Sequence, residues 1–322
     1  MTFYLTDEQL RSEGPPRRLD NSTRVQFAEC PRAYYWNTRG VETAGRPVYF
    51  AWGQAWHSGL ASWHRTGDLG EAQLRAEEVF LGESKGEIPV ADTVHTSGRL
   101  RELLGFYAAD YPSEPWEVIG EELGFEHPLP PIATGATYAP HEYFYCGSID
   151  AYIDWPQFGT LLREDKTTGM WITDKIVGQW RFSSQVDGYI WFLQEFRGEK
   201  VFGCLMNIAC KKTSKGGSTP QFARSLEQRT DEDLESFLRG VGHSFRELEH
   251  CWDQWFFPKA VNHVICAGGI GKSPCAYRNL CVQPQPYREL DPFSISGYTA
   301  KEEKWEPWKR FGDAGAGKEI DW

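Results

Sequence analysis

Long apolar runs are missing from this sequence of 322 residues, and so is an excess of positive charge. No stretch of eighteen consecutive apolar residues is present, which excludes a conventional membrane-spanning helix. The first twenty residues are polar and lack the apolar region of a signal peptide, so we expect a soluble protein in the cytoplasm. The net charge of −11 argues against a general polyanion binder, although it is compatible with a local basic groove.

Two further absences limit the domain organisation. No GxxxxGK[ST] phosphate-binding loop is found, which excludes a helicase motor within this sequence, and no internal repeat is visible. The length suits one large domain or two ordinary ones. We expect a flexible lead over residues 1–20, one main domain over residues 21–283, and a polar, tryptophan-containing tail over residues 284–322.

The most informative stretch is GSIDAYIDWPQFGTLLREDK, from Gly147 to Lys166. Proline and glycine near its centre predict a tight turn between two strands. Side chains two apart in a strand share a face, so Glu164 and Lys166 project together and Asp165 points away. The hairpin can bring Asp150 beside Glu164, and two carboxylates with an ammonium are typical of a Mg²⁺ or Mn²⁺ site. The alternative is that these residues are solvated surface charges, because short strings of this kind often match by chance.

Two predicted helices carry further candidate side chains. Residues 48–66 have tryptophans at three- and four-residue spacing, which predicts a helix with His57 beside its buried stripe. The alternative for His57 is an ordinary core histidine. Residues 181–196 also favour a helix, and Gln185 and Tyr189 share one of its faces because they are four residues apart.

A predicted strand over residues 117–127 carries two acids. Glu121 and Glu122 are adjacent and therefore point to opposite faces of the strand, so that only one of them can face a given site.

Eight cysteines in an intracellular chain favour metal or redox use over a disulfide scaffold. Cys266, Cys275 and Cys281 cluster within residues 257–283, where dense glycine and proline disfavour regular structure. Three thiolates could hold such a loop through a metal. Cys30 lies alone before a proline, and by itself this position favours a buried thiol.

These segments occur in the order of a known family. STRVQFAECPRAYYW is followed by GQAWH, a strand with EE, GSIDAYID, EDK and QVDGY. The order resembles the RecB-type branch of the PD-(D/E)XK nuclease superfamily over about residues 21 to 282. The CPRAYY segment is similar to the one that brings the first cluster cysteine in the iron–sulfur members, which include the AddB nuclease domain and CRISPR-associated and phage exonucleases.

The resemblance implies an α/β, restriction-endonuclease-like fold in which helices flank a central mixed sheet. It also implies a metal-dependent DNA nuclease, with exonuclease action in recombination, repair or phage DNA processing as the expected role. A separate helicase or recombination protein is compatible with it as a partner.

The resemblance assigns a metal site of Mg²⁺ or Mn²⁺ residue by residue. Its ligands match His57, Asp150 and Glu164, together with the backbone carbonyl of Asp165. Asp150 and Glu164 are therefore both ligands and catalytic residues.

Further catalytic roles follow from the same resemblance. Lys166 matches the lysine that positions the attacking water. Gln185 and Tyr189 match a pair that faces the active site from the following helix. Glu122 matches an acid on an earlier strand, although Glu121 lies next to it.

The resemblance implies that Cys30, Cys266, Cys275 and Cys281 hold a 4Fe–4S cluster, with a structural Zn²⁺ as the alternative. Such a cluster would join the N-terminal and C-terminal segments. The sequence departs from the family here, because eight residues separate Cys266 from Cys275 where the family often has two.

Two other functions are open at this point. One is a catalytically silent iron–sulfur protein that binds DNA as a scaffold, and the other is a metal-dependent hydrolase of a different substrate. Four basic residues are candidates for contacts with DNA phosphates, with a solvated loop as the alternative: Lys211, Lys212, Lys215 and Arg224.

Overall fold

The computed structural model describes residues 2–45, 47–85, 92–134, 143–212, 222–268 and 274–309. This part of the chain forms two compact units. The first unit combines Met1–Gly45, Phe125–Gly147 and Glu235–Lys309, and the second combines Arg46–Gly124 with Ser148–Leu234. The chain therefore enters each unit more than once, which the predicted division at residues 20 and 283 did not anticipate.

Strands pair within each unit, in both parallel and antiparallel directions. In the second unit β4 (Phe144–Trp155) pairs antiparallel with β5 (Gly159–Thr168), and β5 pairs parallel with β6 (Cys204–Cys210). The last strand, β7 (Phe222–Glu227), pairs antiparallel with β6, and β3 (Glu117–Pro128) pairs with β4. In the first unit the start of β4 pairs parallel with β1 (Arg18–Asp20). The predicted mixed sheet is confirmed.

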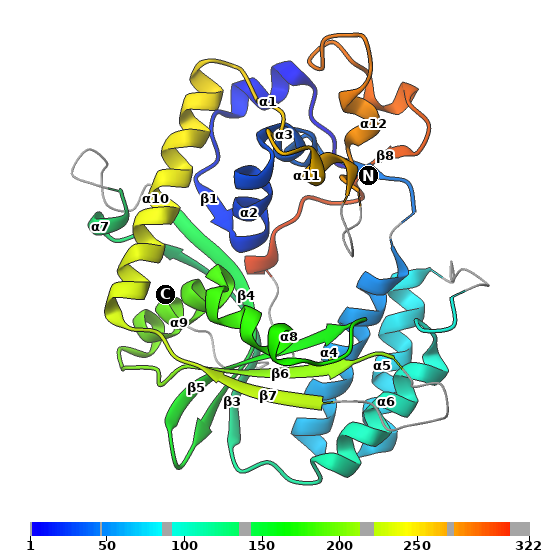
Figure 1. Cartoon of the computed structure of the whole chain (residues 1–322), viewed down its shortest axis with the longest axis vertical. Coiled ribbons are helices and arrows are strands. Elements are labelled where there is room, and N and C mark those ends of the chain that lie inside the picture. Colours follow the sequence, from blue (N-terminus) through cyan, green and yellow to red (C-terminus); the bar gives the residue numbers. More distant parts are fainter. Residues whose placement is uncertain are drawn as a thin grey trace. The chain divides into compact units, whose positions relative to one another are not determined.

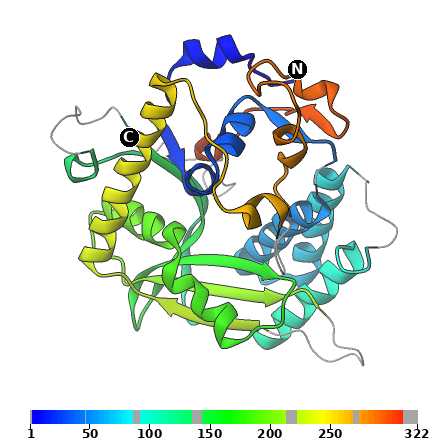
Figure 2. The same cartoon turned by 45° about the horizontal axis from the view of Figure 1, so that its top comes forward.

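Helices of the second unit pack beside these strands. Three of them, α4 (Val48–Thr66), α5 (Leu69–Ser84) and α6 (Ser97–Asp110), lie side by side in Figure 1, and Figure 2 shows the same grouping from a second direction. Trp52, Trp56 and Leu60 of α4 are buried with Ala209 of β6 in one apolar cluster. The predicted tryptophan stripe is thus the face that α4 buries, as the 3.6-residue period requires. The remaining helices of this unit are α8 (Asp174–Gly178), the 3₁₀ helix η1 (Gln179–Phe182) and α9 (Ser184–Arg197).

The first unit contains the N-terminal and C-terminal segments. Its helices are α1 (Asp7–Glu13), α2 (Asn21–Glu29), α3 (Pro31–Thr38), α7 (Pro131–Thr134), most of α10 (Asp231–Asp253), α11 (His263–Ala267) and α12 (Arg278–Cys281). Its other elements are β2 (Val41–Thr43), β8 (Tyr298–Ala300) and the 3₁₀ helices η2 (Pro292–Ser294) and η3 (Pro307–Lys309). Among the described residues, no helix is both long and apolar enough to cross a membrane.

The predicted flexible lead is structured instead. Thr6 and Gln9 form a reciprocal capping box that starts α1, and Leu10 of this helix is buried. Leu19 of β1 is also buried, and β1 pairs with a strand more than a hundred residues further along the chain. Polarity alone suggested a lead because this pairing is not local.

The predicted tail and the cysteine-rich stretch also contain regular structure. Within residues 284–309, β8 pairs antiparallel with β2, while residues 310–322 lie outside the described residues. Short helices α11 and α12 interrupt the stretch that we expected to be irregular. Helix α2 ends before Pro31, and its N-cap is Asp20, whose side chain accepts a hydrogen bond from the Thr23 amide.

Candidate active site

The β4–β5 hairpin brings two predicted ligands together. Its register pairs Ala151 with Arg163 and Trp155 with Gly159, whose φ of +75° suits the tight turn. The Asp165 amide donates a hydrogen bond of 2.9 Å to Oδ2 of Asp150. The side chain of Asp150 is therefore held against the segment that carries Glu164 and Lys166.

Glu164 is the most deeply buried of these charged groups. Its side chain is 1% exposed, and its Oε2 accepts a hydrogen bond of 2.6 Å from Nζ of Lys166. The second oxygen, Oε1, is buried and has no hydrogen-bond partner in the described structure. An unpaired carboxylate oxygen in the protein interior is costly in free energy. Such an oxygen is a typical ligand of a divalent cation.

His57 reaches the hairpin from α4. Its Nδ1 lies 3.0 Å from Oδ1 of Asp150, and its side chain is partly exposed. The neighbouring residue Trp56 is fully buried, so the helix is fixed by its tryptophan face while His57 projects beside it. His57 is thus placed against a predicted metal ligand, whereas a core histidine would be enclosed by apolar groups.

The four charged groups control one another's protonation. Burial raises the pKa of Glu164, the nearby charge of Asp150 raises it further, and the resulting value is about 7. For Asp150 the effect of burial is outweighed by His57 and Lys166, which hold the pKa of its carboxyl below the usual range. Burial opposes the charged form of Lys166, but the carboxylates of Glu164 and Asp150 raise its pKa above the usual value. Strongly perturbed groups of this kind are typical of functional sites.

The pKa of His57 is also raised. Burial would lower it, but the Asp150 carboxylate favours the charged imidazolium. In this structure the Asp150 carboxylate is paired with His57, and the Glu164 carboxylate is paired with Lys166.

The side chains of His57, Asp150 and Glu164 are of the types that bind a divalent cation, but they are not arranged around a common point. Among the described residues, no three His, Cys, Asp or Glu side chains form a ready-made metal-binding group. Glu164 nevertheless supplies a buried unpaired oxygen, and Asp150 is held ionised beside it. The predicted role of His57 as a metal ligand stays a prediction.

Asp165 projects to the opposite face, as the strand period predicts. Its Oδ1 accepts a hydrogen bond of 2.7 Å from Asn207, and its Oδ2 lies 3.1 Å from a guanidinium nitrogen of Arg163. Its side chain is thus engaged, and the predicted contribution of its backbone carbonyl stays a prediction.

Gln185 and Tyr189 lie on α9, which packs near β5. Tyr189 is buried, and Gln185 is half-buried one turn earlier. The helix is thus in the predicted place, and the contribution of these two side chains to the site stays a prediction.

The two acids of β3 differ in environment. Glu122 has an exposed side chain and a left-handed backbone conformation with φ of +48°. Glu121 has a buried Oε1 without a hydrogen-bond partner in the described structure, and burial raises the pKa of its carboxyl. The predicted catalytic role of Glu122, with Glu121 next to it, stays a prediction.

A buried polar network behind β5 was not predicted. Arg224 forms an ion pair with Glu114, and both guanidinium and carboxylate contact the hydroxyl of Tyr107. The Tyr107 hydroxyl also accepts a hydrogen bond from Asn207, which binds Asp165. The sequence carries no signal for this network because its members are up to 117 residues apart.

Two of the predicted phosphate-binding residues contact other side chains of the protein instead. Arg224 stacks over Tyr111 at 3.6 Å from the ring centroid in addition to its ion pair. Lys211 is buried, with its Nζ 3.0 Å from Nε2 of His95. Lys212 is exposed, and Lys215 lies outside the described residues.

All four predicted cluster cysteines belong to the first unit. Cys30 is buried at the start of α3, and the amide of Cys275 donates a hydrogen bond of 3.2 Å to the carbonyl of Cys266. Burial, together with the charges of Cys30 and Cys266, raises the pKa of the Cys275 thiol. The thiols are therefore electrostatic neighbours, although the described residues show no assembled group of three ligands. The cluster stays a prediction.

Comparison with known proteins identifies one family. The sequence model of the family described as "PD-(D/E)XK nuclease superfamily" matches residues 22–282. No curated protein matches the chain.

Solved structures resemble the chain only distantly. The crystal structure of a "Putative exonuclease" from Eubacterium rectale is 12% identical, with a TM-score of 0.45, covering 86% of this chain and 95% of that one. The crystal structure of SSO0001 is also 12% identical, with a TM-score of 0.35, and covers 86% and 93% of the two chains.

Proposed function

We propose that this chain, which belongs to the PD-(D/E)XK nuclease superfamily, is a metal-dependent deoxyribonuclease. We further propose that it acts as an exonuclease. The observation that carries the proposal is the charged group of Asp150, Glu164 and Lys166, in which one carboxylate oxygen of Glu164 is buried and has no partner in the described structure. An unpaired carboxylate oxygen in the interior is costly for a group that only stabilises the fold.

The ion we propose is Mg²⁺ or Mn²⁺, held by Asp150 and Glu164 with His57 and the carbonyl of Asp165. Carboxylate and carbonyl oxygens are the ligands that these hard cations prefer. Such an ion supplies Lewis acidity toward the phosphodiester and acidifies the attacking water.

Lys166 then acts as a charged donor and not as a base. The raised pKa keeps its ammonium protonated at neutral pH. A fixed positive charge at this place offsets the negative charge that develops on the phosphate during hydrolysis. Glu164 holds the ammonium in position through the 2.6 Å contact.

The segment that follows β5 is rich in aromatic side chains. The segment after β5 carries Trp171, which is partly exposed, and Phe182, which is 88% exposed. Trp180 of the same segment lies with its ring centroid 5.9 Å from Nζ of Lys166. Aromatic side chains stack on unpaired bases whatever the sequence, so this segment is suited to a DNA end.

The finer assignments belong to the same proposal. We place the chain in the RecB-type, AddB-like branch, with Cys30, Cys266, Cys275 and Cys281 holding a 4Fe–4S cluster and Zn²⁺ as the alternative. Action in the cytoplasm, in DNA recombination or repair beside a separate helicase or recombination protein, is consistent with this branch.

The test is cleavage of end-labelled single-stranded and duplex DNA by anaerobically purified protein with Mg²⁺, with Mn²⁺ and with EDTA. Metal-dependent cutting that is lost in Lys166→Ala and Glu164→Ala is expected, and a ladder that shortens from the ends would establish the exonuclease. Binding of DNA by folded, metal-replete protein without any cutting would instead support the catalytically silent scaffold.

A further inference from the structure

Three neighbouring strands of the second unit carry a row of polar side chains across one face of the sheet. The register places Asp165 of β5 beside Asn207 of β6, and Asn207 beside Arg224 of β7. Asn207 shares its face with Ala209, two residues further on, which packs in the apolar cluster of α4. The row therefore lies on the covered face of the sheet, whereas the two neighbours of Asp165 along β5 project from the other face.

The members of this row are joined by direct hydrogen bonds. The side-chain amide of Asn207 donates hydrogen bonds of 2.7 Å to Oδ1 of Asp165 and of 2.9 Å to the hydroxyl of Tyr107. Nε of Arg163 donates to Oδ2 of Asp165 at 3.2 Å. Nε of Arg224 donates to Oδ1 of Asn207 at 3.3 Å. Both oxygens of the Asp165 carboxylate are thus held, one from its own strand and one from the next.

The row is deeply buried. Arg163 is 1% exposed, and Asp165 and Asn207 are each 2% exposed. Burial of an ion pair costs desolvation free energy, and apolar side chains of similar volume often stabilise a fold as well or better. The ion pair is therefore weak evidence for a role in stability, and the contacts of the Asp165 main chain indicate a different role.

The main chain of Asp165 contacts the proposed metal site. The paired register of β4 with β5 ends at Ala151 and Arg163. Two residues beyond Arg163, the Asp165 amide donates its hydrogen bond of 2.9 Å to Oδ2 of Asp150. Because the amide and the carboxylate belong to the same residue, the contacts that fix the Asp165 side chain also restrain the direction of its amide.

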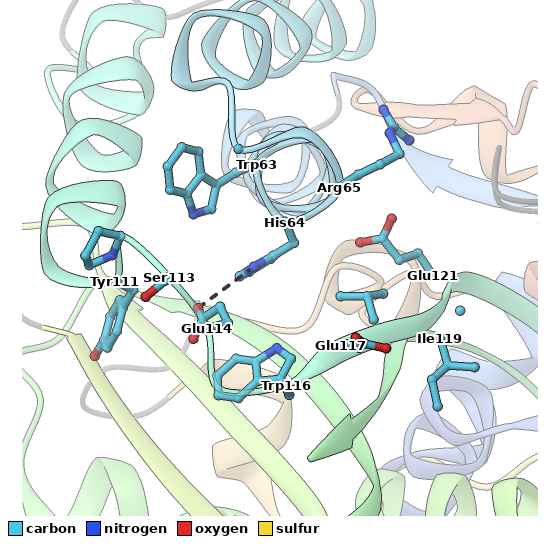
Figure 3. Close-up of a pocket in the computed structure, with 14 residues that line it drawn as sticks. Trp63, His64, Arg65, Tyr111, Ser113, Glu114, Trp116, Glu117, Ile119 and Glu121 are labelled. Carbon is cyan, nitrogen blue, oxygen red and sulfur yellow. Dashed lines mark ion pairs between the residues drawn. The ribbon is translucent and has the colours of Figure 1, made fainter. Parts of the chain in front are cut away.

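The second oxygen of Asp150 is restrained from α4. Its Oδ1 lies 3.0 Å from Nδ1 of His57. The same helix contacts the far end of the row, because Arg224 pairs with Glu114 and Nδ1 of His64 lies 3.8 Å from that carboxylate, as Figure 3 shows. The contacts thus form a closed ring that joins α4 to three strands of the sheet and includes Asp150.

We propose that the side chains of Asp165 and Asn207 are positioning groups for the metal site. Asn207 holds the Asp165 carboxylate, and the Asp165 amide in turn fixes the orientation of the Asp150 carboxylate before an ion binds. The same contacts restrain the Asp165 carbonyl, which the proposed site uses as a ligand. The inference rests on the proposed nuclease function and adds to it two side chains that act through Asp150.

The first test is binding of Mn²⁺ by the whole protein, measured by calorimetric titration without DNA. Asp165→Asn leaves a donor facing a donor within the row, and Asn207→Asp sets two carboxylates side by side. Both changes keep the shape of the side chain. Each is expected to weaken Mn²⁺ binding about tenfold or more, as the loss of a hydrogen-bond partner behind a metal ligand does.

The exchanged pair, Asp165→Asn with Asn207→Asp, separates positioning from general damage. It moves the carboxylate to β6 and again sets a donor facing an acceptor, so Mn²⁺ affinity should return to within about threefold of the wild type. Phe80→Leu is the control for stability, because it removes buried volume on α5, which carries no residue of the row. It should lower Tm and leave Mn²⁺ affinity unchanged.

A second readout needs no metal. Hydrogen exchange of the metal-free protein, followed by mass spectrometry of peptides that contain residue 165, should be faster in both single variants than in the wild type. The exchanged pair should restore slow exchange. Asp150→Ala removes the acceptor and gives the reference rate for an Asp165 amide without this hydrogen bond.

The outcomes are distinguishable. Wild-type Mn²⁺ affinity in both single variants, or a loss no larger than that of Phe80→Leu, would overturn the inference, and so would a loss that the folded exchanged pair does not reverse. In each case metal-dependent cutting by the wild-type protein would still support the nuclease. A wild-type protein that neither binds Mn²⁺ nor cuts DNA would overturn the proposed function, and the inference with it.

Discussion

The charged hairpin of the second unit and the cysteine segments of the first differ in how their geometry is held. Asp150, Glu164 and Lys166 lie on two hydrogen-bonded strands, so that backbone register alone places them side by side. Cys266 and Cys281 lie in helices of only five and four residues.

The difference shows what a ligand has to contribute in each region. The strands position these side chains before any ion binds. This arrangement costs free energy, because it leaves one oxygen of Glu164 unpaired and raises the pKa of its carboxyl. Short helices and loops do not hold four thiols in ligating geometry by themselves. A metal there would supply folding energy, whereas in the hairpin it would supply chemistry.

The largest effect should follow from Lys166→Ala. Removal of the ammonium takes away a charge aimed at the phosphate, and the cleavage rate should fall at least about 100-fold. The measurement is the rate of cutting of end-labelled DNA at saturating Mn²⁺, with thermal unfolding as the control for folding. A variant that cuts within tenfold of the wild type would remove Lys166 from the mechanism.

Cys281→Ser tests the cysteine segments. If Cys281 ligates a metal, iron or zinc content should fall and Tm should drop by about 10 °C or more, because metal binding is linked to folding. Metal analysis, visible absorbance and calorimetry of anaerobically prepared protein give the result.

The matched control is Cys251→Ser, which makes the same change on α10 of the same unit. Cys251 is buried, whereas Cys281 is partly exposed. If packing alone mattered, the Cys251 variant should be the more damaged, so greater damage in Cys281→Ser would identify the ligand.

Metal affinity of the hairpin should depend on pH. Glu164 has a pKa of about 7, above its usual value, so below pH 7 a proton on Glu164 competes with the ion while Asp150 stays ionised. Affinity for Mn²⁺ should therefore rise as pH increases from about 5 to about 7. Calorimetric titration measures it, and Glu164→Gln should bind more weakly and with a flatter pH profile.

The smallest effect should come from Glu122. Its φ of +48° favours glycine, so Glu122→Gly should leave stability unchanged or raise it by up to about 1 kcal/mol. Because the side chain is exposed, cleavage should stay within about twofold of the wild type, both in this variant and in Glu122→Gln. A large loss of cleavage in both would restore the catalytic role that the family resemblance assigns to Glu122.

Much of the second unit was predictable because its signals are local. The tryptophan spacing of α4 and the proline–glycine turn of the hairpin match elements at Val48–Thr66 and Phe144–Thr168. Elements of the first unit such as β1 and β8 were missed because each is a three-residue strand whose partner is distant in sequence. Their stability comes from pairing and burial, which local composition does not encode.

The sequence by itself determined which residues could carry the chemistry, because strand and helix periods place Glu164 with Lys166 and leave His57 beside a buried stripe. Only the tertiary structure decided how those residues interact. It brought His57 to Asp150, buried one oxygen of Glu164 without a partner, and used Arg224 for an internal ion pair. It also formed a pocket from the end of α4, the loop of residues 111–116 and the start of β3 (Figure 3). Periodicity is a property of neighbouring residues, whereas burial and unmet hydrogen bonds arise only when distant segments pack together.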